Sequence, residues 1–164
     1  MIRRLCLVAA AGLVLASAAG AADITRVPIP NSTFPISQAV RVPAGAETIY
    51  FSGLTPPVAK QDAPKDSIEA YGSDTEAQAI GTFERLGGVL QAQGLGFGDI
   101  VSLHVYLVGD PAKGGKLDFA GFQNAYTKYF ATPTQPNKPA RTTVQVAGLA
   151  SPGILIEIEA TAAK

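Results

Sequence analysis

Five short segments of the chain alternate hydrophobic with polar residues or are rich in β-branched and aromatic residues, as β-strands are. These segments are residues 36–42, 48–52, 100–108, 141–146 and 154–160. A turn sequence, Ala44-Gly45-Ala46, separates the first two, so we expect them to form a β-hairpin. In the third segment, one face carries Val101, Leu103, Val105 and Leu107, and the other carries Ser102, His104, Tyr106 and Val108.

Two longer segments carry hydrophobic residues at helical spacing. In the first, Ser73 followed by Glu76 predicts an N-cap with a capping box, and Gly94 predicts the end of the helix. Its apolar stripe consists of Ala79, Ile80, Phe83, Leu86, Val89 and Leu90. The second predicted helix covers residues 117–130, and we expect its aromatic side to pack on a sheet. That side consists of Phe119, Phe122, Tyr126 and Phe130.

The order of these elements is strand, strand, helix, strand, helix, strand, strand, which predicts an α+β fold. In this fold a mixed β-sheet is covered on one face by two helices. We expect residues 23–34, which are rich in Pro, Thr and Ser, to form an extended arm leading into a single domain at 35–164. Residues 53–72 contain three prolines and several charges, and predict a long loop.

The first 22 residues have the pattern of a secretory signal peptide. Arg3 and Arg4 give a positive start, residues 5–15 are apolar, and small residues at 19–21 precede the expected start of the mature chain near Ala22. The apolar run is too short to span a bilayer as a stable helix. We therefore expect a periplasmic or secreted protein whose mature form is not inserted in a membrane.

The composition of the mature chain excludes several kinds of functional site. The sole cysteine, Cys6, lies in the predicted signal peptide, and the chain contains one histidine. We therefore expect no disulfide, no thiolate nucleophile and no multi-histidine metal site. Without Arg3 and Arg4 the chain has 11 basic and 13 acidic residues. This slightly acidic balance argues against a nucleic acid as the main partner.

The strongest candidate for chemistry is Arg141, at the start of a predicted strand. Its planar guanidinium could bind a carboxylate through two parallel hydrogen bonds. On the next strand Glu157 and Glu159 share a face, and one of them could position a water molecule. The alternative is that Arg141 ends a strand and pairs with a surface carboxylate, which is the commoner role for this residue type. His104 lies in mid-strand, where a hydrogen-bonded structural role is the more frequent one.

Several short motifs together resemble the reactive intermediate deaminase family, the RidA or YjgF type. They are Pro35-Ile-Ser-Gln-Ala-Val40, Ile49-Tyr-Phe-Ser-Gly53, Gly98-Asp-Ile-Val101, Asp118-Phe-Ala120, Pro139-Ala-Arg141 and Ile156-Glu-Ile-Glu-Ala160. The resemblance covers residues 35–162. It implies a chorismate-mutase-like fold and a homotrimer whose sheets form a barrel, with ligand clefts between subunits. It also implies hydrolysis of enamine and imine acids to 2-keto acids and ammonia without a cofactor.

Matched position by position, the resemblance implies that Arg141 grips the substrate carboxylate and that Glu157 places the attacking water. Ser52 and Gly53 match a strand end that lines the cleft. Three further positions of the implied pocket depart from the usual residues: Ile36 replaces tyrosine, Gln123 replaces asparagine and Thr143 replaces cysteine.

Two functions remain open from the sequence. One is a hydrolase of small imine or enamine acids, and the other is a non-catalytic trimeric protein that binds a carboxylate or a partner. The ribonuclease activity sometimes attached to this family fits poorly with export and with an acidic surface.

Overall fold

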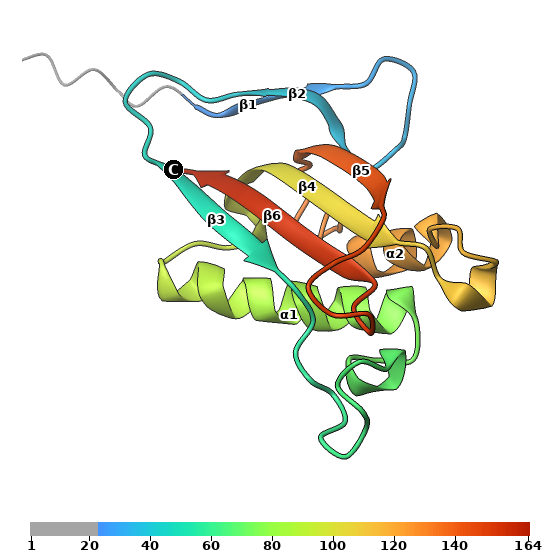
Figure 1. The fold of residues 1–164 in the computed structure, drawn as a ribbon. Coiled ribbons are helices and arrows are strands. Elements are labelled where there is room, and N and C mark those ends of the chain that lie inside the picture. Colours follow the sequence, from blue (N-terminus) through green and yellow to red (C-terminus); the bar gives the residue numbers. More distant parts are fainter. Residues whose placement is uncertain (1–22) are drawn as a thin grey trace, which may run out of the picture.

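The computed structural model describes residues 23–164, so the predicted signal peptide lies outside the described residues. A four-stranded β-sheet carries two helices on one face (Figure 1). In spatial order its strands are β3 (Thr48–Leu54), β6 (Ile156–Ala163), β4 (Ile100–Val108) and β5 (Ala140–Val146). β4 and β5 are parallel, whereas the other neighbouring strands are antiparallel. The predicted α+β class with a mixed sheet is confirmed.

A second, two-stranded sheet corrects the predicted hairpin. β2 (Ser37–Arg41) pairs antiparallel with β1 (Thr25–Pro28), which lies in the predicted arm, whereas β3 pairs with β6. The arm is therefore extended, as expected, but it is also paired. Arg26 fixes it to the domain because its Nη2 donates hydrogen bonds to the carbonyl oxygens of Gly98 and Ile100, at 2.7 and 3.2 Å.

The two helices are α1 (Thr75–Ala92) and α2 (Phe119–Tyr126). α2 is shorter than the predicted segment 117–130. Asp118 caps its first turn by accepting from the Gly121 amide at 3.1 Å, and beyond Tyr126 the chain continues to Phe130 as a turn. Three short 3₁₀ helices complete the elements: η1 (Ile68–Ala70) in the long loop, η2 (Phe97–Asp99) and η3 (Pro111–Lys113).

The core lies between the helices and the sheet. Hydrophobic and polar residues alternate along β4, and its hydrophobic face is the one that the helices cover. Val101, Leu103, Val105 and Leu107 are all buried, as predicted. Phe83 of α1 lies at the centre of an aromatic cluster, with the Tyr129 ring centroid 4.9 Å away and those of Phe122 and Tyr126 each 6.3 Å away. This packing holds α2 and the turn after it against α1.

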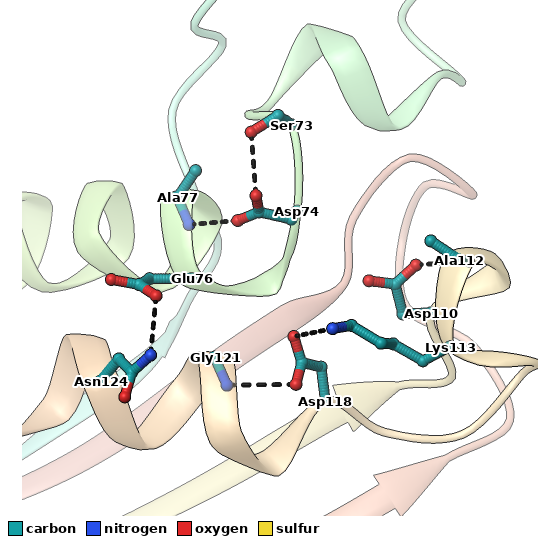
Figure 2. A network of polar contacts seen from close by, with 10 residues as sticks. All are labelled: Ser73, Asp74, Glu76, Ala77, Asp110, Ala112, Lys113, Asp118, Gly121 and Asn124. Atoms are coloured by element: carbon teal, nitrogen blue, oxygen red, sulfur yellow. Dashed lines mark hydrogen bonds and ion pairs between the residues drawn. The ribbon is translucent and has the colours of Figure 1, made fainter.

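A polar contact also ties the two helices together on their solvent side (Figure 2). The Glu76 carboxylate of α1 accepts from Asn124 Nδ2 at 3.0 Å, as Figure 2 shows. It also accepts from Lys128 Nζ at 3.1 Å. These two hydrogen bonds lower the pKa of Glu76. The neighbouring residue on α2 is Gln123, so the contact helps to place a residue of the predicted site.

The N-cap of α1 is Asp74 and not Ser73, as Figure 2 shows. The Asp74 carboxylate accepts from the Ala77 amide at 2.8 Å, while the Ser73 hydroxyl only donates to Asp74, at 3.1 Å. We predict that Asp74→Ala lowers the free energy of unfolding by about 1 kcal/mol, as loss of an N-cap does, and that Ser73→Ala costs roughly half of that or less. Urea denaturation measures both. A larger cost for Ser73→Ala would contradict this assignment.

Candidate functional site

Arg141 points from β5 toward the helices. In the parallel register it lies beside Leu103, which is fully buried on the helix-covered face of the sheet. Four aromatic rings surround its guanidinium carbon. The distances to the ring centroids are 4.2 Å for Tyr126, 5.0 Å for Phe122, 5.5 Å for Phe34 and 5.8 Å for Phe119. All four are within the range of a cation–π interaction.

The hydrogen bonds of Arg141 are incomplete. Its Nη2 donates to Gln123 Oε1 at 3.0 Å, whereas Nη1 is buried and has no partner within the described chain. Burial lowers the pKa of Arg141, and the nearby Tyr126 opposes this shift. An arginine keeps its charge at neutral pH even so. Burying a cation with an unpaired N–H donor costs free energy, and an anionic ligand that accepts from this donor would offset the cost.

Thr143 adds a second unpaired polar atom on the same face. It lies two residues after Arg141 and beside the buried Val105, so both side chains point to the helix-covered side of β5. Its Oγ1 is buried without a partner among residues 23–164. Both atoms are buried within the chain, and β5, which carries them, is the edge strand of the four-stranded sheet.

A separate group forms where β3 meets β6. The register shifts between Phe51 and Leu54, and this irregularity holds Ser52 and Gly53. The Glu157 carboxylate lies directly against the Gly53 backbone, because a Cβ built at Gly53 would overlap Glu157 Oε1. Glycine is therefore the residue that leaves room for this carboxylate. The structure thus brings Gly53 and Glu157, which the resemblance assigned separately to the pocket, into contact within one chain.

Arg141 and Glu157, however, do not meet within one chain. Glu157 pairs with Tyr106 of β4, so it lies on the face of the sheet that the helices leave uncovered, opposite to the face of Arg141. β4 also separates β6 from β5, which places the two residues two strand spacings apart, roughly 10 Å across the sheet. Within one chain the predicted site residues thus form two separate groups, one around Arg141 and one around Glu157, which we call half-sites.

Three further residues that the sequence analysis considered are Gln123, Ile36 and His104. Gln123 holds Arg141, as described. Ile36 is partly buried against the core, and together with Arg141 and His104 it lines a cavity of about 600 Å³. His104 lies on the uncovered face with Nδ1 3.5 Å from Glu159 Oε2, and the Tyr106 hydroxyl donates to the same oxygen at 3.1 Å.

The sequence did not indicate the aromatic surroundings of Arg141. Phe34 comes from the arm, and the helical spacing of Phe119 and Tyr126 indicated only that they pack on the sheet. Within residues 23–164, no group of three or more His, Cys, Asp or Glu side chains is placed to hold a metal ion. No helix in the same part of the chain combines the length and hydrophobicity needed to cross a membrane.

Comparison with protein families gives one match. The model of the family described as Endoribonuclease L-PSP covers residues 29–164. A RutC family protein of Pyrococcus horikoshii is 30% identical over 135 residues, which are 82% of this chain and 91% of that protein.

Solved structures give the same result. A conserved Rid family protein from Yersinia pestis, YyfB, superposes with a TM-score of 0.62 and 26% identity over 85% of this chain and 98% of its own. TdcF of Escherichia coli, solved with bound serine, superposes with a TM-score of 0.56 and 28% identity over 86% of this chain and 97% of its own.

Proposed function

Because the chain belongs to the Endoribonuclease L-PSP family, the RidA or YjgF type that its motifs predicted, we propose that it hydrolyses small 2-imino or enamine acids. The products are a 2-keto acid and ammonia. In this proposal Arg141 binds the carboxylate of the substrate, and Glu157 of a second subunit acts on the reacting carbon.

The observation that carries the proposal is the buried, unpaired Nη1 of Arg141. Nη1 and the Thr143 hydroxyl offer two donors on one side of the edge strand, which suits the two oxygens of a carboxylate. The rings around the guanidinium keep water away and so strengthen the charge-assisted hydrogen bonds. The bound serine of TdcF, which also carries a carboxylate, is consistent with this kind of ligand.

The chemical step needs little beyond a positioned water. Glu157 accepts a proton as the water oxygen bonds to the imine carbon, which gives a tetrahedral carbinolamine. Glu157 returns that proton to the nitrogen, which becomes an amino group. The hydroxyl proton of the carbinolamine then passes through Glu157 to the nitrogen, the C–N bond breaks, and the carbonyl of the keto acid forms as ammonia leaves. Glu157 is regenerated as a carboxylate. One water is consumed and one ammonia is released, so the step requires no cofactor.

The test is the release of ammonia and keto acid from freshly generated 2-iminobutanoate. We expect the protein to accelerate this release in proportion to its concentration, while Lys60→Ala, an exposed variant in the long loop, does so equally. If 2-oxobutanoate binds but the imine is not hydrolysed faster than in buffer, the alternative of a non-catalytic carboxylate-binding protein is correct.

We also predict a homotrimer, as the family resemblance implies. In this proposal the two half-sites, which face different surfaces of the chain, come from different subunits. The uncovered face of the sheet supports this, since it presents Val144, which is 40% exposed, and Tyr50, which is 80% exposed. Sedimentation velocity at micromolar concentration should give three times the chain mass. A monomer under these conditions would remove the complete site.

We further propose that the protein acts after export. The reason is the signal pattern of residues 1–22, which predicts a periplasmic or secreted location.

A further inference from the structure

The exposed aromatic rings of Phe34 and Phe119 lie together beside Arg141. Phe34 is 38% exposed and Phe119 is 40% exposed, and they are two of the six large hydrophobic residues that are exposed in the described chain. Their ring centroids are 6.5 Å apart with an angle of 10° between the planes. One ring precedes β2 and the other opens α2, so two distant segments of the chain combine to build one exposed apolar surface.

This surface adjoins the proposed carboxylate anchor. The centroids of Phe34 and Phe119 lie 5.5 and 5.8 Å from the guanidinium carbon of Arg141. A carboxylate that reaches Nη1 therefore places the rest of its molecule within a few ångströms of the two rings. Apolar groups gain free energy there because they and the rings leave water together.

There is also space for such a group. A cavity of about 710 Å³ lies next to the anchor, lined by Phe34 and Gln123, which both contact the Arg141 side chain, and by Phe130. Its volume is within the range of pockets that take small molecules. A methyl or ethyl side chain would leave most of this cavity and the Phe34 ring, which lines it, in water.

We propose that the substrate of this site carries an apolar side chain of four or more carbons, branched or aromatic. The inference rests on the proposed function and narrows its substrate class. Lys138 also lines the cavity and would suit an acidic side chain instead. The rings outweigh it, because a lysine on a flexible stem keeps its hydration and pairs weakly with an exposed carboxylate.

The experiment compares imines made by amino acid oxidases from alanine, 2-aminobutanoate, leucine, phenylalanine and glutamate. Each buried methylene contributes roughly a four-fold gain. We therefore expect kcat/KM for the leucine- and phenylalanine-derived imines to exceed that for the alanine-derived imine at least ~10-fold. Phe34→Ala and Phe119→Ala should reduce this preference, measured as the ratio of the leucine- to the alanine-derived kcat/KM, by roughly five-fold or more, because a weakened contact at Arg141 affects every imine and cancels in the ratio.

Val58→Ala is the matched control, because Val58 is 37% exposed but lies in the long loop and contacts neither ring. Trimer formation is checked for each variant. A second measure is the affinity of the wild-type protein for pyruvate, 4-methyl-2-oxopentanoate, phenylpyruvate and 2-oxoglutarate, obtained by titration. This measure needs neither a folded variant nor catalytic turnover. Tighter binding of the two large apolar acids is expected.

The outcomes separate this inference from the proposed function. Equal rates for all imines, or a best rate for the glutamate-derived one, would overturn the apolar preference and leave imine hydrolysis in place. Absence of hydrolysis together with tighter binding of the large apolar acids would overturn the proposed function and support the apolar pocket. Absence of both would overturn both.

Discussion

Arg141→Ala is expected to weaken the binding of 2-keto acids by one to two orders of magnitude, which corresponds to about 2–3 kcal/mol. The alanine removes the unpaired Nη1 that the proposal assigns to the carboxylate. Arg141→Lys keeps a positive charge but cannot donate to Gln123 and to a ligand with the same planar geometry, so we expect a loss of similar size. Isothermal titration with 2-oxobutanoate measures both variants.

The control for Arg141 is Arg85→Ala, which removes an arginine of the same charge from an exposed part of α1. It should bind the keto acid as wild type does. Sedimentation confirms the oligomeric state of each variant before titration, because a lost trimer would also weaken binding. If an intact trimer of Arg141→Ala binds as tightly as wild type, Arg141 is a structural residue and the anion-site proposal is wrong.

Local patterns in the sequence predicted β4 well. Its bounds and its buried face follow from strict alternation, and the structure confirms both over residues 100–108. The predicted hairpin of 36–42 with 48–52 was wrong for a related reason. A turn signal tells where the chain bends but does not identify the partner of a strand. β3 pairs instead with β6, about a hundred residues later, and such a pairing depends on tertiary contacts.

The same limit applies to the site. The identity of Arg141 was visible as a lone arginine at a strand start, but the face on which it lies depends on its register with Leu103. The register of Glu157 with Tyr106 puts that carboxylate on the opposite face. Neither register can be read from spacing along one strand, because a shift of one residue reverses the face. The rings around Arg141 come from two separate segments, which spacing along the chain does not bring together.

Glu157→Gln is expected to reduce imine hydrolysis by roughly 10²- to 10⁴-fold, because the amide cannot accept the proton of the attacking water. Binding of 2-oxobutanoate, which depends on Arg141, should change little. Gly53→Ala should act in the same direction, since its Cβ would displace the Glu157 carboxylate from its place against the backbone. Gly88→Ala is the matched control, because a Cβ there meets no atom within 4 Å.

Mixing the two defects tests whether the site is shared between subunits. Arg141→Ala and Glu157→Gln chains are unfolded together in equal amounts and refolded into mixed trimers. Suppose that Arg141 of one subunit works with Glu157 of the next. A Glu157→Gln chain still supplies an intact Arg141, and an Arg141→Ala chain still supplies an intact Glu157. A site is therefore intact wherever the first subunit is a Glu157→Gln chain and the next is an Arg141→Ala chain. Random assembly then restores about a quarter of the wild-type rate, although each parent alone is inactive. Mixed trimers as inactive as the parents would show that the two residues do not act together across an interface.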